Sequence, residues 1–334
     1  MGNNGTKVAV CSIGAEQIAR KNIAEPNGWR YFHEFQHVDL WGSPINPEQG
    51  FFPDVMIFKG WFVQDYSTLN RHMRLLGDVG FHYNKKCGKA GRIVILWAGS
   101  DVLQMGLFYD KMGHYEAKIF QDLRSDRFVH IPVSEDQGQE LKRLFGLKPK
   151  APLPTPCRKI FEKLPFSKGP TIAVYMPATR TDFYHFDILH EVAKQMPQMK
   201  FIFYHWMFKT PDMERAKPLP NVEYRYPCSR EEYEQVIADS WASLRIPDHE
   251  GLSGGSAEFL MAGRPVFSCH DMPKWPAKIK RERITPDSIV EVLKDLVPDV
   301  PEEVQEHYRH LLDPAKFKER LQARIKATWP ELTL

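Results

Sequence analysis

The chain has 334 residues, which is too long for one ordinary hydrophobic core and predicts two domains of roughly 150 residues each. Its net charge of +3 excludes the strongly basic class of nucleic-acid-binding proteins. The five cysteines form no Cys-x-x-Cys pair, which excludes a zinc ribbon and a disulfide framework and favours a reducing compartment. No secretory leader is visible and no apolar run approaches the ~20 residues that cross a bilayer, so we expect a cytoplasmic protein without a transmembrane segment.

The first half of the chain alternates short apolar runs with amphipathic stretches. We expect strands at 7–12, 29–40, 54–60, 92–98 and 127–133, and helices at 66–78, 109–124 and 134–145. Ser134 and Gln137 match the Ser-x-x-Gln capping box and predict the start of the last of these helices. Near-continuous apolar strands separated by helices predict a parallel sheet covered on both faces.

The alternation restarts after residues 146–156, a segment with four prolines that is typical of a linker. We expect strands at 171–176, 200–205, 222–225, 242–246 and 264–268. We expect helices at 186–195, at 230–239 after a capping box of Ser229 and Glu232, from about 255, and in a tail after 287 with breaks near Pro298, Pro301 and Pro314. The chain therefore predicts an α/β protein with two Rossmann-like, doubly wound domains that face a cleft, with ligands beyond the carboxyl ends of the strands.

The segment "HEGLSGGSAEFLMAGRPV" (249–266) places Glu250 and Glu258 on either side of three glycines, Gly251, Gly254 and Gly255. We expect the helix to start near Gly255 or Ser256, with Glu250 in the preceding loop and Glu258 in the first turn. Glycine backbone at a helix N-terminus suits a phosphate or diphosphate, and a carboxylate beside it suits the hydroxyls of a sugar or ribose. A simpler interpretation stays open, in which Glu258 complements the helix dipole and the glycines form a tight turn.

The Glu-x7-Glu spacing followed by "EFLMAGRPVF" resembles the carboxyl-terminal signature of retaining GT-B glycosyltransferases of the family-four type. The matching positions are Glu250, Gly251, Glu258, Ala262, Gly263, Pro265 and Val266, whereas Phe259 replaces the usual Ala. The resemblance implies transfer of a sugar from a nucleotide-diphosphate donor, a UDP- or GDP-sugar, to a hydroxyl acceptor with retention of configuration. It also implies an acceptor domain at 1–150, a donor domain at 151–312 and a C-terminal helix at 313–334 that packs back on the first domain. The chain contains no Asp-x-Asp, which agrees with chemistry that needs no metal or other cofactor.

The resemblance also assigns roles to single residues. Glu250 would lie against the donor sugar, and Glu258 would bind the ribose. The remaining donor-site candidates are Gly14, Arg180, His185, Gly251, Leu252, Ser253, Gly254 and Gly255. Among these, Arg180 is the first member of a basic pair that meets the diphosphate, and His185 stands where the family has a lysine. Gly99 and Ser100 lie on the acceptor side, and Asp101 is a second catalytic candidate that could equally be a helix N-cap.

Three alternatives remain open. His33, Glu34 and His37 match the His-Glu-x-x-His signature of zinc peptidases, but the alternating pattern around them favours a strand, which would hold the two histidines too far apart. A protein that binds a sugar nucleotide without turnover would show the same motif. The basic and aromatic segment 81–92 could meet a polyanionic acceptor such as DNA with hydroxylated bases. The acceptor (a saccharide, a lipid or a modified nucleic acid), the donor base and the oligomeric state cannot be read from the sequence.

Overall fold

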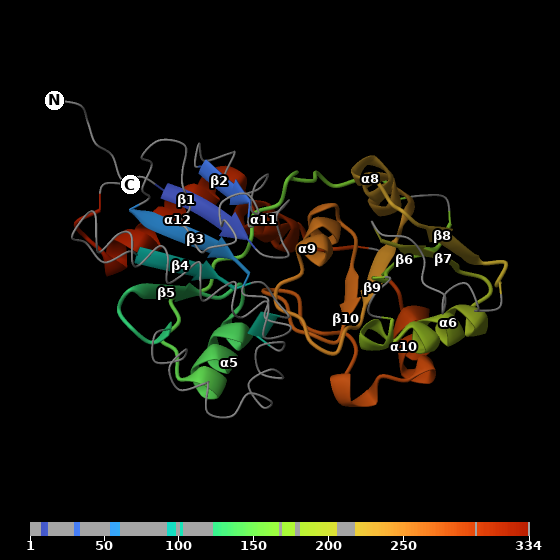
Figure 1. Cartoon of the computed structure of the whole chain (residues 1–334). Helices are drawn as coiled ribbons and strands as arrows, with labels where there is room; N and C mark the ends of the chain where they lie inside the picture. The colour runs from blue at the N-terminus through green and yellow to red at the C-terminus, as the bar shows by residue number, and fades with distance from the viewer. Residues whose placement is uncertain are drawn as a thin grey trace. The chain divides into compact units, whose positions relative to one another are not determined.

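The computed structural model describes residues 8–12, 30–33, 54–60, 92–97, 101–102, 123–166, 169–177, 181–205, 218–297 and 299–332 (Figure 1). The chain divides into two compact units, Met1–Arg158 with Leu312–Leu334, and Lys159–Leu311. The boundaries expected from the sequence, 150 and 312, stay a prediction. Among the described residues, no helix has both the length and the apolar character needed to cross a membrane.

The first unit is built on a five-stranded parallel sheet in the order β2-β1-β3-β4-β5. Its strands are β1 (Val8–Ser12), β2 (Arg30–His33), β3 (Val55–Lys59), β4 (Arg92–Leu96) and β5 (Phe128–Ile131). Strands β3 and β5 are buried along their whole length, and β4 is buried after its first residue. Burial on both faces explains why these strands are continuous apolar runs in the sequence.

Two described helices belong to the first unit, α5 (Glu135–Phe145) and α12 (Pro314–Thr328). Leu321 and Ile325 follow Phe317 at intervals of four residues, so all three lie on one stripe of α12. That stripe joins one hydrophobic cluster with sheet residues Val55, Ile57, Val94, Leu96, Val129 and Ile131. The C-terminal helix therefore covers one face of the N-terminal sheet, where Figure 1 draws it in red against the blue strands.

The second unit has a five-stranded parallel sheet in the order β10-β9-β6-β7-β8. Its strands are β6 (Thr171–Tyr175), β7 (Lys200–Tyr204), β8 (Val222–Arg225), β9 (Ala242–Arg245) and β10 (Val266–Ser268). Its helices are α6 (Phe186–Gln195), α8 (Arg230–Asp239), α9 (Gly254–Met261), α10 (Pro286–Lys294) and α11 (Glu302–Leu311), with short 3-10 turns η4 (Asp182–Tyr184) and η5 (Arg281–Arg283). Helices α6 and α10 pack together on one face, and α8 and α9 lie on the other (Figure 1).

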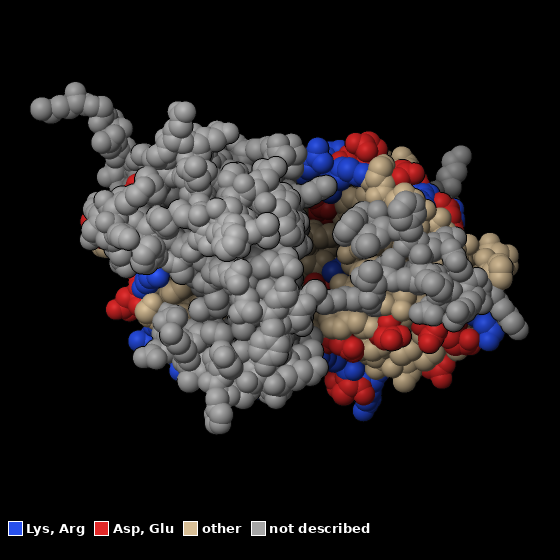
Figure 2. All heavy atoms as spheres, viewed as in Figure 1, with Lys and Arg blue, Asp and Glu red and all other residues tan. Residues whose placement is uncertain are grey.

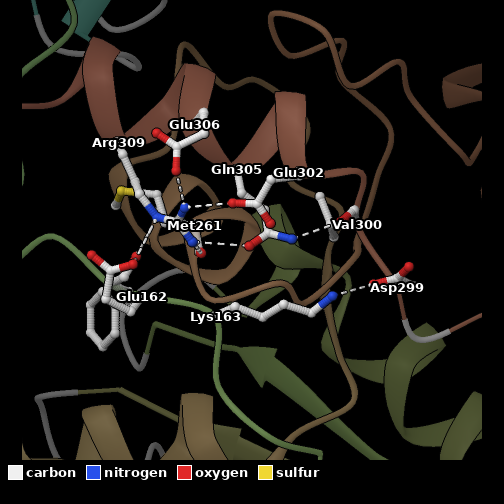
Figure 3. Close-up of polar contacts among 10 residues, drawn as sticks. Glu162, Lys163, Met261, Asp299, Val300, Glu302, Gln305, Glu306 and Arg309 are labelled. Carbon is white, nitrogen blue, oxygen red and sulfur yellow. Dashed lines mark hydrogen bonds and ion pairs between the residues drawn. The ribbon is translucent and has the colours of Figure 1, made fainter.

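Two arginines fix the segment that opens the second unit. Arg264 is fully buried and donates to the carbonyl oxygens of Leu164 (3.0 Å) and Pro165 (2.6 Å). Arg309 of α11 donates to the carbonyl oxygens of Phe161 (2.9 Å) and Met261 (3.0 Å), as Figure 3 shows for Met261. Because Met261 is the last residue of α9, these bonds anchor the C-terminal end of that helix.

The expected elements agree closely with the described ones. Helices α6 and α8 have the predicted bounds, and the expected strands exceed the observed ones by one or two residues at most ends. The strand expected at 29–40 is described only over β2, which ends at His33. Glu34 and His37 lie outside the described residues. The helix expected at 66–78 and most of the helix expected at 109–124 also lie outside them. His33 is therefore in a strand and does not have the helical conformation that the zinc-peptidase signature requires.

Candidate functional site

The carboxyl edge of the second sheet has a topological switch point between β6 and β9. From β6 the chain adds β7 and β8 on one side, and then β9 and β10 on the other. Tyr175 is the last residue of β6, and Arg245 is the last residue of β9. Doubly wound sheets bind ligands at such a point, because the loops leaving the two strands diverge there.

Arg245 forms a partly buried cluster with aromatic and acidic side chains at this point. Its guanidinium lies 4.1 Å from the ring centroid of Tyr175 and 5.3 Å from that of Tyr184. Its Nη2 donates to Tyr184 Oη at 3.3 Å, and its Nε donates to a carboxylate oxygen of Glu250. Burial lowers the pKa of the Arg245 guanidinium, but Glu250, Tyr184 and Tyr175 together outweigh that effect and raise this pKa.

Helix α9 begins at Gly254, earlier than the sequence predicted. Ser253 is its N-cap, because its hydroxyl accepts from the backbone N–H of Ser256 at 3.1 Å. Both glycines of the "GG" pair are therefore helical, and Glu258, the fifth helical residue, lies in the second turn. The prediction that Glu258 belongs to the first turn was wrong, since a serine cap started the helix before the glycines ended.

Glu258 is held by a cation from another helix. Arg230, the first residue of α8, donates from Nη2 to Glu258 Oε1 at 3.0 Å and from Nη1 to Oε2 at 3.3 Å. The glutamate side chain is only 7% exposed. Burial raises the pKa of the Glu258 carboxyl, and the charge of Arg230 opposes that rise. The simpler interpretation of Glu258 as a partner of its own helix dipole is not supported, because its partner is a guanidinium from α8.

The glycines at the start of α9 leave space next to the helix N-terminus. A Cβ added at Gly254 would meet no atom within 4 Å, and one at Gly255 would meet Tyr233 Oη at 3.4 Å, an ordinary contact. Neither glycine has a positive φ, so the fold does not require glycine at these positions. The first turn of α9 thus presents bare backbone and the positive end of its dipole to open space, as an anion site needs.

The corner between η4 and α6 is tied to the loop that carries Glu250. His185 is at the start of α6 with φ 54° and ψ 50°, a left-handed conformation that is costly for a residue other than glycine. Its Nε2 lies 3.0 Å from Asp248 Oδ1, and the N–H of Asp248 donates to the carbonyl of Phe183 at 3.0 Å. Arg180, the other predicted phosphate ligand, lies outside the described residues.

Four residues that contact Glu250, Glu258 or Arg245 were not predicted, namely Tyr175, Tyr184, Arg230 and Arg245. One signal was available in the sequence, because "ASLRI" places a charged residue between the apolar Leu244 and Ile246. Nothing local indicates that Arg230 reaches α9, since the two residues of that ion pair are 28 positions apart. The structure brings together Glu250, His185 and the loop before α9, and it places Leu252, Ser253 and Gly251 in that loop.

The first sheet has a different polar cluster at its carboxyl edge. Asp101 is 0% exposed, and its Oδ1 accepts from the N–H of Val102 at 2.9 Å and from Gln137 Nε2 at 3.3 Å. Lys59 is 2% exposed, and burial lowers its pKa to about 8 although Asp101 opposes the shift. Gly14, Gly99 and Ser100 lie outside the described residues.

The capping box predicted at Ser134 is only half formed. Ser134 accepts from the N–H of Gln137 at 3.3 Å, as expected. The Gln137 side chain does not return to the cap: its Oε1 accepts from the N–H of Val133 at 2.8 Å, and its Nε2 donates to Asp101. Gln137 therefore joins α5 to the buried cluster around Asp101. By contrast, the box of Ser229 and Glu232 is complete.

Comparisons with known proteins extend the description of the fold. No family model matches the chain, and no curated protein matches it in sequence. Among solved structures, it is similar to sucrose-phosphate synthase from Thermosynechococcus elongatus, with a TM-score of 0.63 and 12% identity over 97% of this chain and 99% of that chain. It is also similar to the lipopolysaccharide outer core galactosyltransferase WaaB, with a TM-score of 0.60 and 12% identity over 96% of this chain and 99% of that one.

A third similar structure is that of TarM, with a TM-score of 0.57 and 14% identity. The alignment covers 81% of this chain and 54% of TarM, so the chain spans about half the length of that protein. At these identities the likeness concerns the fold alone. Together with the two parallel sheets, it shows that the chain has the two-domain, Rossmann-like GT-B fold.

Proposed function

We propose that this protein is a glycosyltransferase that moves a sugar from a nucleotide-diphosphate donor to a hydroxyl acceptor. The observation that carries the proposal is the pair Glu250 and Glu258, on either side of the open N-terminus of α9 and next to the switch point of the second sheet. The similar structures support it, since WaaB is named a galactosyltransferase and one structure of mutant S. aureus TarM is a complex with Fondaparinux, alpha-GlcNAc-glycerol and UDP.

In this proposal, Glu258 accepts hydrogen bonds from the ribose hydroxyls. Arg230 holds the carboxylate from one side, which opposes the rise in its pKa and fixes its orientation. A carboxylate has about four lone-pair sites, so it can bind a guanidinium and a hydroxyl together. Glu250 lies against the donor sugar in the same way, held by Arg245. The two carboxylates then bind the two hydroxyl-bearing ends of the donor.

The charged middle of the donor lies at the start of α9. The backbone from Gly251 to Gly255 lines it, with the helix dipole and Arg180 supplying positive charge and with His185 as a further candidate ligand. As the glycosidic bond breaks, negative charge grows on the diphosphate, and oriented amides and cations stabilise it. We propose that the reaction retains configuration and needs no metal, with Gly14 near the phosphates of the donor and with Gly99 and Ser100 on the acceptor side.

A binding and hydrolysis screen on the whole chain tests this function. UDP- and GDP-sugars are offered to the wild type and to the variants Glu250→Ala and Glu258→Ala. We expect the wild type to bind and slowly hydrolyse at least one donor, and the Glu258 variant to lose about 100-fold in affinity, as for removal of a buried, charged hydrogen-bond partner.

The matched control is Glu234→Ala. Glu234 also pairs with Arg230, at 3.1 Å from its Nε, but its side chain is more exposed than that of Glu258, and it lies on α8 rather than α9. We expect this variant to keep wild-type affinity. Unchanged binding and hydrolysis in both the Glu250 and Glu258 variants would refute the site, and binding without any turnover would favour a non-catalytic protein.

A further inference from the structure

The ion pair between Arg245 and Glu250 is unexpected between two apolar neighbours at the end of a strand. Leu244 and Ile246, on either side of the arginine, are fully buried. Removing an arginine and a glutamate from water costs several kcal/mol for each ion, and an apolar pair of similar volume often gives equal or greater stability. The fold therefore gains little from this pair, and its place at the switch point of the sheet points to a ligand.

The contacts of Arg245 leave it able to bind an anion. Glu250 accepts from Nε and Tyr184 accepts from Nη2, while the Tyr175 ring supports the guanidinium at 4.1 Å. A guanidinium carries N–H donors on all three of its nitrogens, and its planar fork suits phosphate oxygens. Since three side chains fix its orientation, little side-chain entropy remains to be lost when a phosphate arrives.

The neighbourhood of Arg245 also contains His185. His185 stands where the resemblance to family-four glycosyltransferases puts a lysine. His185 directly follows Tyr184, which bonds to Arg245, and it contacts Asp248, two residues before Glu250. Arg245 thus lies in the same network of contacts as the substituted position. An arginine brings a planar fork of N–H donors and a permanent positive charge to this network.

We propose that Arg245 contacts the diphosphate of the donor and supplies a permanent positive charge beside His185. The inference rests on the proposed function and adds a residue to it. Glu250 keeps hold of Nε and orients the guanidinium, and the other N–H groups face the phosphates. Arg245 then makes the site selective for a nucleoside diphosphate over a monophosphate, because the second phosphate adds the charge that it binds.

Calorimetric titration with UDP, UMP, GDP and GMP tests this without any need for sugar transfer. The variants are Arg245→Gln, Arg245→Lys and the double variant Arg245→Gln with His185→Lys. We expect Arg245→Gln to lower diphosphate affinity about 30-fold and monophosphate affinity less than about threefold, with Arg245→Lys in between. The added lysine in the double variant should restore at least about fivefold of the diphosphate affinity.

The control is Arg281→Gln, which removes an exposed arginine that donates to the carbonyl of Asp248 in the same loop. It should keep the wild-type ratio of diphosphate to monophosphate affinity. If Arg245→Gln does not fold, the ratio of diphosphate to monophosphate affinity measured for Arg245→Lys tests the inference. An unchanged ratio in the Arg245 variants would overturn the inference while leaving the proposed function standing. A wild type that binds none of the four nucleotides would overturn both.

Discussion

The carboxyl edges of the two sheets carry the same kinds of charge in different settings. At the edge of the first sheet, Lys59 and Asp101 are almost completely enclosed. At the edge of the second sheet, the side chains of Arg245 and Glu250 are 11% and 16% exposed, and the helix that follows begins with bare glycine backbone in open space. Charge at the carboxyl edge of a sheet is therefore common to both units, and accessibility is what distinguishes a candidate ligand site from a structural cluster.

Removing one cation from each edge should give the largest contrast. Arg230→Met leaves Glu258 buried without its guanidinium, and Lys59→Met takes the positive charge away from Asp101. We expect Arg230→Met to lose about 3 kcal/mol in free energy of unfolding, as when one partner of a buried pair is removed. Lys59→Met should also lose stability, because Asp101 loses the attraction of a nearby positive charge. Only Arg230→Met should also lose donor binding. Denaturant unfolding measures the loss of stability, and nucleotide titration measures the loss of donor binding. If Lys59→Met also lost donor binding, the first edge could not be distinguished from the candidate ligand site.

The variant Asp101→Asn tests whether the carboxyl edge of the first sheet takes part in catalysis. The carboxylate accepts hydrogen bonds from Val102 and Gln137 and is not exposed, so we expect a loss of about 1–3 kcal/mol in unfolding free energy. Turnover at saturating donor should fall no more than about fivefold. A loss of turnover of about 100-fold or more in a variant of wild-type stability would instead support the catalytic role predicted for Asp101.

Acidification should weaken the first unit through His130. Its Nε2 lies 2.7 Å from the carbonyl oxygen of Leu123, and its Nδ1 accepts from Trp97 at 3.3 Å, so the neutral ring satisfies both contacts. Burial lowers its pKa to about 4, against an ordinary value near 6.5. The unfolded chain therefore binds a proton that the folded one does not, and stability is lost as the pH falls from about 6.5 towards 4.

This single residue should remove about 1.5 kcal/mol of unfolding free energy between pH 6.5 and pH 5. Urea unfolding at the two pH values measures the change in the wild type and in His130→Asn. The variant should lose less stability on acidification than the wild type does. Equal losses in both proteins would show that other groups carry the pH dependence.

Gly254→Ala should have the smallest effect, with a rise in stability and a fall in donor affinity. The new methyl group would meet no atom within 4 Å, and alanine suits a helix better than glycine does, so stability should rise by up to about 0.5–1 kcal/mol. Donor affinity should fall several-fold if phosphates approach that backbone. Gly169→Ala is the matched control, because a Cβ there also meets nothing within 4 Å, and its donor affinity should stay at the wild-type value.

Much of the fold follows from short-range sequence signals. Hydrophobic periodicity acts within a few residues and predicted the bounds of α6, and a capping box also marked the start of α8, so both agree with the structure. The same rules failed where two local signals competed. Glycines predicted a late start for α9, but the Ser253 cap began it at Gly254. The Gln137 side chain donates to the buried Asp101 and does not complete the predicted capping box.

The sequence by itself determined the two α/β halves, most element bounds and the presence of two glutamates around a glycine-rich helix start. Only the tertiary structure decided what those glutamates contact, since Arg230 comes from another helix and Tyr175 and Tyr184 come from a strand and a turn about 60–70 residues before Arg245. The physical reason is how far apart in the chain the interacting residues are. Helix caps and periodicity are fixed by neighbours in the chain, whereas the partners of a buried charge are fixed by desolvation and by whichever elements the sheet brings together.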